Sequence, residues 1–298
     1  MTRALIITNP MAARANAAGL GEARRRLARG GLAVEVVGTT EPGHAERIAR
    51  DAVGDGFELL IAHGGDGTVM EILASLVGTD LPLGLLPAGT GNLLAGNLGI
   101  RRRASAAAEV ILKGRKRRID VGRLETSTGA RYFVVAAGMG FDAELMHRTP
   151  AHHKRQFGIG AYLATAVGLA TSLTRATLRI TTEDGEFELP AATVLVANCR
   201  EIIPGVLSLD DSIAFDDGIL NVVVFDAGSL PEAARVAWRL LLRQGREEPG
   251  MRVLAARNVT ISADRQLPVQ ADGEACGFQP LAVAVVPRAL TVLAPTHG

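Results

Sequence analysis

Short apolar runs alternate with amphipathic stretches along the first 120 residues. The apolar runs have the length of buried strands, and the amphipathic stretches repeat apolar residues at helical spacing, as Val69, Ile72 and Leu76 do. Such alternation with short connections predicts a parallel sheet that is covered by helices on both faces. The expected strands are Ala4–Thr8, Ala33–Val37, Phe57–Ile61 and Leu83–Leu86, and the expected helices are Ala17–Arg29, His44–Val53, Val69–Leu76 and Asn92–Leu98.

The pattern changes at about Ile119, after which short β-type runs dominate. These runs predict a mainly antiparallel β-sandwich. We therefore expect an α/β domain at residues 1–120, to which a final strand near 289–298 returns, and a β-rich domain at 121–288. The expected strands of the second domain are Tyr132–Ala136, Thr177–Thr182, Ala192–Ala197, Leu220–Phe225, Val259–Ser262, Leu267–Gln270 and Val283–Val286, with helical insertions near Ile159–Leu173 and Glu232–Leu242.

One uncharged stretch, Phe157–Thr174, approaches the shortest length that can span a membrane. It is rich in Gly, Ala and Thr, so we expect a helix buried against the protein and no transmembrane segment. The 298-residue chain has a net charge of +1 and only 4% aromatic residues, which argues against a nucleic-acid surface built on base stacking. Its two cysteines, Cys199 and Cys276, are too few for a disulfide framework and favour a reduced, cytoplasmic compartment.

Two glycine-rich turns stand between a predicted strand and a predicted helix. The first lies within "AHGGDGTVMEIL", Ala62–Leu73, and the second is "PAGTGN", Pro87–Asn92. A strand, a glycine-rich turn and a helix together point bare backbone N–H groups at an anion such as phosphate. In a parallel sheet both turns lie at the carboxyl edge, where ligands bind. Neither turn matches the Walker pattern or the usual dinucleotide fingerprint, and no lysine follows either of them.

An ordered set of motifs makes the sequence recognisable. "GGDGT" at Gly64–Thr68 is followed by Glu71, and it stands between Asn9-Pro10 and "PAGTGN". This order resembles the diacylglycerol kinase catalytic domain of bacterial soluble lipid kinases, which are related to sphingosine kinases and NAD kinases. The resemblance covers nearly the whole chain and implies the two-domain architecture given above, with residues 1–120 as the nucleotide-binding domain and 121–288 as the lipid-substrate domain. It continues with "AAGMGFDAELM" at Ala136–Met146, "KRQFGIGAYL" at Lys154–Leu163, "VLVANC" at Val194–Cys199, "DDGILNVVVF" at Asp216–Phe225 and "ADGEA" at Ala271–Ala275.

The resemblance implies that the protein binds ATP with Mg²⁺. Gly64, Gly65, Asp66, Gly67 and Thr68 would surround the ATP phosphates, and Thr68 is expected to cap the following helix. Asp66 would hold Mg²⁺ directly or through water, because a bare carboxylate repels phosphate; an Asx turn is the alternative. The remaining nucleotide residues implied by the resemblance are Asn9, Thr40, Glu71, Thr90 and Asn92, although Thr40 equally fits a helix start.

Two carboxylates near the end of the chain are the candidates for chemistry. Phosphoryl transfer to an alcohol needs a base near the attacking hydroxyl. By resemblance Glu274 is the catalytic base, and Asp272 is its partner or its competitor for that role. On one strand the two would share a face, whereas a β-turn would leave both solvated.

A further metal site is implied by the resemblance at the turn before one of the predicted strands. Asp217 would hold Mg²⁺ there together with the carbonyl oxygens of Ala214 and Ile219. Ligation by oxygen alone suits Mg²⁺. A plain turn before the strand explains Asp217 nearly as well.

The expected activity is an ATP- and Mg²⁺-dependent lipid kinase that converts diacylglycerol to phosphatidic acid. A long-chain base or NAD as acceptor, and a non-catalytic nucleotide-binding regulator, are the alternatives that the sequence leaves open. The substrate would be reached at the membrane surface, and the basic runs Arg24–Arg26, Arg101–Arg103 and Arg115–Arg118 would draw a cytoplasmic protein to the inner leaflet. The sequence is also compatible with a homodimer.

Overall fold

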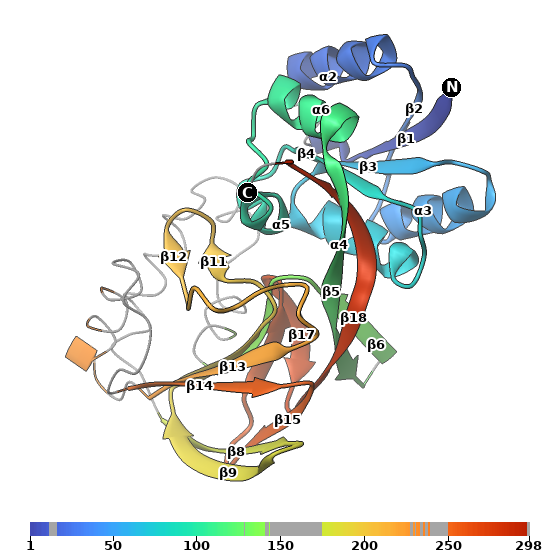
Figure 1. Ribbon diagram of the computed structural model, residues 1–298. Helices are drawn as coiled ribbons and strands as arrows, with labels where there is room; N and C mark the ends of the chain where they lie inside the picture. Colours follow the sequence, from blue (N-terminus) through green and yellow to red (C-terminus); the bar gives the residue numbers. More distant parts are fainter. Residues whose placement is uncertain are drawn as a thin grey trace. The chain divides into compact units, whose positions relative to one another are not determined.

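The computed structural model describes residues 1–11, 17–127, 129–140, 175–226 and 250–296, with the single residues 143, 229, 231, 232, 235 and 238. The expected helix at Ile159–Leu173, the uncharged stretch Phe157–Thr174 and "KRQFGIGAYL" lie outside the described residues, as do most of Glu232–Leu242 and the end of "AAGMGFDAELM". The chain divides into two compact units, Met1–Ile119 with Arg288–Gly298, and Asp120–Pro287 (Figure 1).

The first unit is built on a parallel sheet with strand order β2-β1-β3-β4, which β18 joins beside β4. Strands β3 and β4 are buried along their whole length, as central parallel strands are, whereas β2 at the edge is largely exposed. The expected parallel sheet is therefore confirmed. The strands are β1 Thr2–Thr8, β2 Leu32–Gly38, β3 Leu59–Gly64, β4 Leu83–Pro87 and β18 Leu281–Ala294.

Helices cover both faces of this sheet. Helices α2 and α6 pack together on one face, and α3 and α4 pack together on the other (Figure 1). Helix α6 approaches β4 closely because Gly84 has no side chain: a Cβ there would lie 3.1 Å from Ile111 Cγ1. The helices are α2 Ala17–Arg29, α3 His44–Gly54, α4 Asp66–Leu76, α5 Leu93–Asn97 and α6 Ala104–Lys113.

The second unit consists mainly of antiparallel strands, as the sequence predicts. One sheet has the order β14-β13-β10-β7-β16-β17, and a second joins β9, β8 and β15 to the part of β18 that belongs to this unit. The strands of this unit not yet given are β5 Arg115–Thr126, β6 Gly129–Phe133, β7 Ala136–Gly140, β8 Ala176–Thr182, β9 Gly185–Ala191, β10 Thr193–Ala197, β11 Glu201–Ile203, β12 Leu207–Ser208, β13 Leu220–Phe225, β14 Met251–Ala256, β15 Asn258–Ala263, β16 Pro268–Ala271 and β17 Glu274–Phe278.

One expected strand is interrupted. Strand β6 ends before Val134 and β7 begins after Val135, so the prediction of a continuous strand at Tyr132–Ala136 is wrong. The N–H groups of Val134 and Val135 donate to the carboxylate of Asp272, at 2.8 and 2.9 Å, instead of to a neighbouring strand. A side chain distant in the sequence has taken over the role of a strand partner at this corner.

Candidate active site

The loops that follow β1, β3 and β4 leave the same edge of the parallel sheet. In the register of the sheet Thr8 lies beside His63, and Gly64 lies beside Pro87. Asn9 joins the group because its N–H donates to the carbonyl of His63 at 3.1 Å. The carboxyl ends of three neighbouring strands therefore bring the two glycine-rich turns and Asn9 together.

The two glycine-rich turns are in direct backbone contact. The N–H of Ala88 donates to the carbonyl of Gly64 at 2.9 Å. A Cβ placed on Gly89 would lie 2.4 Å from the Cα of Gly65, so no side chain fits between the turns at this point. The turns therefore form one frame in which backbone, rather than side chains, lines the contact.

The carboxylate of Asp66 links the first turn to the second. Its Oδ2 accepts the N–H of Asn92 at 2.8 Å, and its Oδ1 accepts the N–H of Leu93 at 2.6 Å. Burial raises the pKa of Asp66, and the two N–H donors oppose this shift. A Cβ on Gly91 would lie 2.5 Å from Asp66 Oδ2 and would push the carboxylate away. Asp66 therefore fixes the geometry of the second turn.

Helix α4 begins earlier than the sequence suggested. It starts at Asp66, so the expectation that Thr68 caps this helix is wrong. The N-cap position falls on Gly65, which has no side chain to accept from the helix N–H groups. Thr68 is instead buried in the first turn of the helix, beside the half-buried Gly67. Its Oγ1 would lie 2.5 Å from a Cβ on Gly64, so this glycine is also required.

Asn92 closes the second turn upon itself. Its side chain accepts the N–H of Gly89 at 2.9 Å and donates to the Gly89 carbonyl at 2.7 Å. Its backbone has φ 55°, in the left-handed region that asparagine tolerates. At the exposed tip of the turn, Nη2 of Arg102 donates to the carbonyl of Thr90 and, at 3.0 Å, to that of Gly91.

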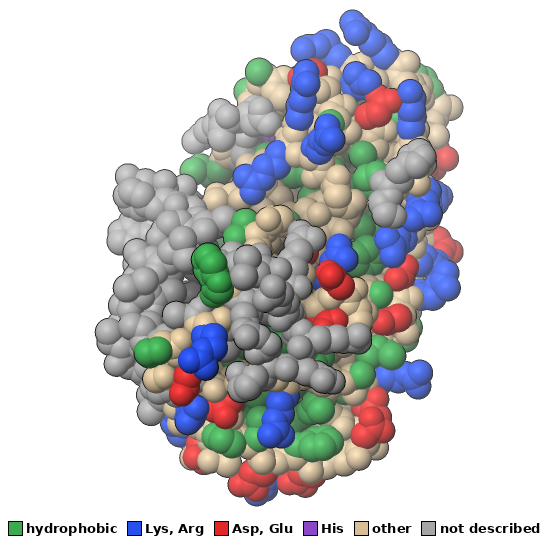
Figure 2. All heavy atoms as spheres, turned by 60° about the vertical axis from the view of Figure 1, so that its left-hand side comes forward, with side chains coloured by type: hydrophobic (Ala, Val, Ile, Leu, Met, Phe, Trp, Pro, Cys, Tyr) green, Lys and Arg blue, Asp and Glu red, His purple; other side chains and the backbone are tan. Residues whose placement is uncertain are grey.

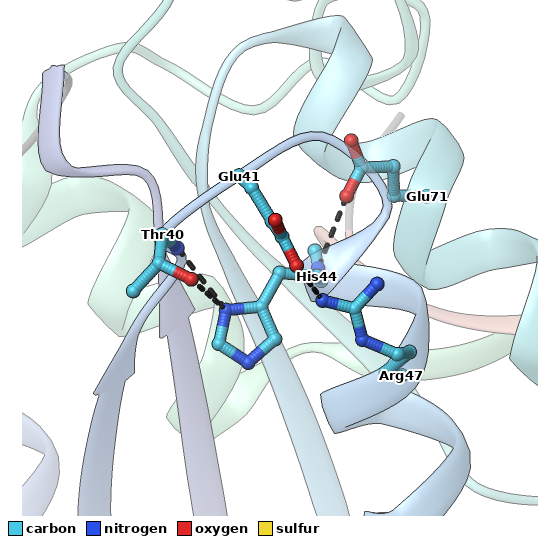
Figure 3. A network of polar contacts seen from close by, with 6 residues as sticks. Thr40, Glu41, His44, Arg47 and Glu71 are labelled. Atoms are coloured by element: carbon cyan, nitrogen blue, oxygen red, sulfur yellow. Dashed lines mark hydrogen bonds and ion pairs between the residues drawn. The ribbon is translucent and has the colours of Figure 1, made fainter.

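Thr40 and Glu71 belong to a polar network around the start of α3 (Figure 3). The N–H of Thr40 donates to Nδ1 of His44 at 3.1 Å, and Thr40 Oγ1 lies 2.9 Å from the same nitrogen. Because a backbone N–H can only donate, Nδ1 accepts and the imidazole proton is on Nε2. The carboxylate of Glu71 accepts the N–H of Ala45 at 3.0 Å, which places a negative charge at the N-terminal end of α3.

His63 is a site residue that the motifs did not indicate. It is only 2% exposed, and its Nδ1 lies 2.8 Å from Oγ1 of Thr8. Burial lowers the pKa of His63, so the neutral imidazole is favoured. Its Nε2 is buried without a hydrogen-bond partner within the part of the chain that the structure describes. The residue ties the ends of β1 and β3 together directly beneath the first glycine-rich turn.

The two candidate carboxylates lie on a tight hairpin between β16 and β17, and not on one strand. Ala271 pairs with Glu274, so Asp272 and Gly273 form a two-residue turn. Both have positive φ, at 45° and 84°, as a type I′ turn requires. The expectation that Asp272 and Glu274 share a strand face is therefore wrong.

The hairpin gives its two acids different environments. Asp272 is buried and accepts three backbone N–H groups, from Val134, Val135 and Ala136, at 2.8–2.9 Å. Glu274, by contrast, is exposed at the start of β17. The alternative of a turn with two solvated acids therefore holds for Glu274 but not for Asp272. Asp272 is occupied in holding the β6–β7 corner, whereas the Glu274 carboxylate is accessible to a substrate.

Asp217 lies in an acidic turn before β13. Its Oδ1 accepts the N–H of Ile219 at 3.0 Å, and burial together with the carboxylates of Asp120 and Asp216 raises the pKa of Asp217. Asp120 is fully buried, and its Oδ2 accepts a backbone N–H of the same turn at 2.6 Å. Among the described residues there is no group of three or more His, Cys, Asp or Glu side chains that could hold a metal. A cation here would depend on main-chain oxygens such as that of Ala214.

Comparison with known proteins agrees with this arrangement. Residues 3–124 match the family model of the diacylglycerol kinase catalytic domain, and residues 134–294 match that of the YegS C-terminal NAD kinase beta sandwich-like domain. A Chromohalobacter salexigens protein named "Probable lipid kinase YegS-like" is 35% identical over 272 residues, which cover 89% of this chain and 84% of that protein. The chain belongs to the diacylglycerol kinase and YegS-like lipid kinase family.

Other members of the family agree along nearly their full length. A Mycobacterium tuberculosis protein named diacylglycerol kinase is 31% identical over 301 residues, which cover 98% of this chain and 95% of that protein. A solved structure from Bacillus anthracis, of a protein that carries the name diacylglycerol kinase, aligns with a TM-score of 0.83 at 24% identity and covers 99% of this chain and 95% of that one. The structural likeness concerns the fold, and the sequence matches carry the family assignment.

Membership of this kinase family implies the use of ATP. In the frame made by the two glycine-rich turns, backbone N–H groups meet the half-buried carboxylate of Asp66. No helix within the described ranges is long and apolar enough to cross a membrane.

Arg102 and His63 contact the two turns or the strands that lead into them, and sequence reasoning missed both residues. Arg102 belongs to a run of three arginines, which is a pattern typical of a solvated face, and its bonds to the second turn depend on how the chain folds back after α5. His63 ends an apolar strand, and its burial next to Thr8 follows from strand register. No local motif could have indicated either residue.

Proposed function

We propose that this protein is an ATP- and Mg²⁺-dependent lipid kinase that transfers the γ-phosphoryl group of ATP to a lipid hydroxyl, with diacylglycerol as acceptor and phosphatidic acid as product. The observation that carries the proposal is the backbone contact between the two glycine-rich turns, closed by Asp66. Such a frame holds phosphate oxygens by N–H groups at the carboxyl edge of the sheet, where nucleotides bind in parallel α/β proteins. The names of the relatives support the choice of diacylglycerol.

In this proposal Gly64, Gly65 and Gly67 allow the phosphates to approach the backbone closely. Asn9, Thr68, Thr90 and Asn92 stand on the loops and helices that follow the same three strands. Thr40 follows β2, and Glu71 supports the start of α3. Positioning and charge compensation account for most of the catalysis of phosphoryl transfer, so a pre-formed frame is the main requirement.

The donor set fits Mg²⁺ at Asp66. Each oxygen of Asp66 accepts one N–H, and a carboxylate has about four lone-pair sites, so capacity for a cation or its water remains. When bound, Mg²⁺ would neutralise phosphate charge, and it is commonly held by one or two carboxylates together with the phosphates. Asp217, with the carbonyls of Ala214 and Ile219, is proposed as a second, structural Mg²⁺ position, because a cation there would offset the charges of Asp120 and Asp216.

Glu274 is proposed as the general base that removes the proton from the attacking lipid hydroxyl. Its exposure leaves the carboxylate free to reach a substrate, whereas the three N–H donors on Asp272 leave that carboxylate little freedom to act as a base. Asp272 is therefore assigned to positioning the hairpin from which Glu274 projects.

The acceptor is proposed to be reached at the surface of an anionic membrane. Lys and Arg side chains gather on the surface of the first unit (Figure 2), and Arg24, Arg25 and Arg29 of α2 are exposed. Each basic residue near an anionic leaflet contributes about 1 kcal/mol of attraction, so a few of them suffice for reversible binding. This supports a peripheral location at the inner leaflet.

The experiment that tests the proposal measures transfer of the ATP γ-phosphate in mixed micelles. Diacylglycerol, a long-chain base and NAD are offered separately, each with and without Mg²⁺. We expect phosphatidic acid from diacylglycerol only when Mg²⁺ is present. We also expect Glu274→Gln to lower kcat by at least about 10²-fold, because a general base typically contributes 10²–10⁴-fold.

Glu188→Gln is the matched control, since Glu188 is an exposed acid on β9 and the substitution removes the same charge. If phosphate is transferred only to the long-chain base or only to NAD, that compound, and not diacylglycerol, is the acceptor. ATP binding without transfer to any acceptor would indicate a nucleotide-binding regulator and would overturn the kinase proposal.

A further inference from the structure

The two glycine-rich turns contain no cation of their own. The chain has only three lysines, Lys113, Lys116 and Lys154, and none of them lies in either turn or directly after one. The charged side chain within the turns is Asp66, whose carboxylate is negative when ionised. Nucleotide phosphates are also negative, so a positive side chain near the frame would add to the Mg²⁺ proposed at Asp66 in reducing repulsion between like charges.

Arg102 brings a positive charge to the second turn. Its Nη2 donates to the carbonyls of Thr90 and Gly91, which fixes one end of the guanidinium on the backbone of the turn. A guanidinium has five N–H donors in a planar fork. The donors on Nε and Nη1 have no hydrogen bond to any described residue, and the side chain is exposed.

Arg102 differs from the two arginines beside it in the run Arg101–Arg103. Its neighbours Arg101 and Arg103 are exposed as well, but neither forms a hydrogen bond to the turn within the described ranges.

We propose that Arg102 binds the phosphates of the nucleotide and supplies the positive charge that the two turns lack. This inference rests on the proposed function, because it assigns a residue to the nucleotide site of that kinase. The N–H groups on Nε and Nη1 remain to donate charge-assisted hydrogen bonds to phosphate oxygens. Because Nη2 is already held by two carbonyls, little side-chain freedom remains to be lost when a phosphate binds.

The experiment compares the binding of ATP, ADP and adenosine by titration calorimetry to the unmodified protein, Arg102→Gln, Arg102→Lys and Arg101→Gln. Arg101→Gln is the matched control, because it removes the same charge from the neighbouring exposed position. We expect Arg102→Gln to weaken ATP and ADP binding about tenfold or more and to leave adenosine binding unchanged. Arg102→Lys keeps the charge but lacks the Nε and Nη1 donors, so its affinity for ATP should lie between those of the unmodified protein and Arg102→Gln.

Each other outcome is decisive. Equal ATP affinity of Arg102→Gln and Arg101→Gln would overturn the inference while leaving the kinase proposal intact. An equal loss of adenosine binding would also overturn it, since Arg102 would then only shape the turn. If the unmodified protein binds none of the three ligands, the proposed function itself fails. If Arg102→Gln does not fold, Arg102→Lys takes its place. A lower ATP affinity with unchanged adenosine affinity would then support the inference, and an equal change in both affinities, or in neither, would overturn it.

Discussion

Asp272 and Glu274 differ by one methylene and stand two positions apart, yet the fold gives them opposite environments. Asp272 is turned inward by a φ of 45° and is surrounded by N–H groups, whereas Glu274 opens the next strand and faces solvent. The difference comes from the two-residue turn, which reverses the chain between them. The carboxylate of Asp272 therefore has a structural role, whereas that of Glu274 has a catalytic role in our proposal.

We expect Asp272→Asn to lower the free energy of unfolding by roughly 2–4 kcal/mol. Asparagine tolerates the positive φ, so the backbone of the turn is kept. Its amide has one acceptor oxygen and directs an NH₂ group at N–H donors, which leaves at least one of the three buried amides without a partner. Urea unfolding measures the change.

Glu274→Gln is the internal control for this prediction, because it removes the same charge from an exposed position and should change stability by less than about 0.5 kcal/mol. Equal stability of the two variants would contradict the structural assignment of Asp272.

At the scale of the elements, the sequence predicted the central strands and the two turns well, because burial on both faces and glycine spacing are local signals. It did not predict α6, or β9, whose exposed and charged residues are not typical of a strand. The joining of the two turns followed from parallel topology. The hydrogen bonds from Asn92 and Leu93 to Asp66 could not be predicted in this way, because they join residues 26 and 27 positions apart and do not affect the periodicity of the sequence.

The contact between the two turns should be sensitive to a single methyl group. We expect Gly89→Ala to weaken ATP binding at least tenfold and to destabilise the protein by about 1–3 kcal/mol, because the new Cβ would lie 2.4 Å from backbone. Nucleotide titration and thermal unfolding measure the two effects.

Gly54→Ala is the matched control. Gly54 ends α3 with no atom within 4 Å of its Cβ position, so alanine should be neutral or slightly stabilising there. Unchanged ATP binding in Gly89→Ala would show that the turns need not touch for the site to work.

At the scale of the whole molecule, the first unit is discontinuous in sequence, since it is made of Met1–Ile119 and Arg288–Gly298. The returning segment supplies buried side chains to that unit, and Val292 lies beside Leu83 of β4. The sequence predicted a strand at Val283–Val286 and a separate final strand near 289–298, whereas β18 runs from Leu281 to Ala294 as one strand through Pro287 and Arg288, where the alternation of apolar and polar residues is interrupted. A long strand that is interrupted by polar residues is therefore hard to predict from the alternation of apolar and polar positions alone.

We expect Leu290→Ala to destabilise the protein by about 2–5 kcal/mol, because the side chain is fully buried and leaves a cavity. Hydrogen exchange followed by mass spectrometry should show loss of protection in peptides from residues 1–119, although the substitution lies far along the chain. Val37→Ala, at a 37% exposed position of β2, should have a much smaller effect. Loss of protection confined to residues 120–287 would contradict the assignment of this segment to the first unit.

The discontinuity of the first unit also has a consequence for the order of events during translation. A ribosome synthesises residues 1–119 first, but the strand that lies beside β4 emerges only after the whole of the second unit. Until then one edge of the growing parallel sheet is unpaired, and unpaired edges invite association with other chains. The nascent protein therefore cannot complete the parallel sheet of its first unit before residues 288–298 have left the ribosome.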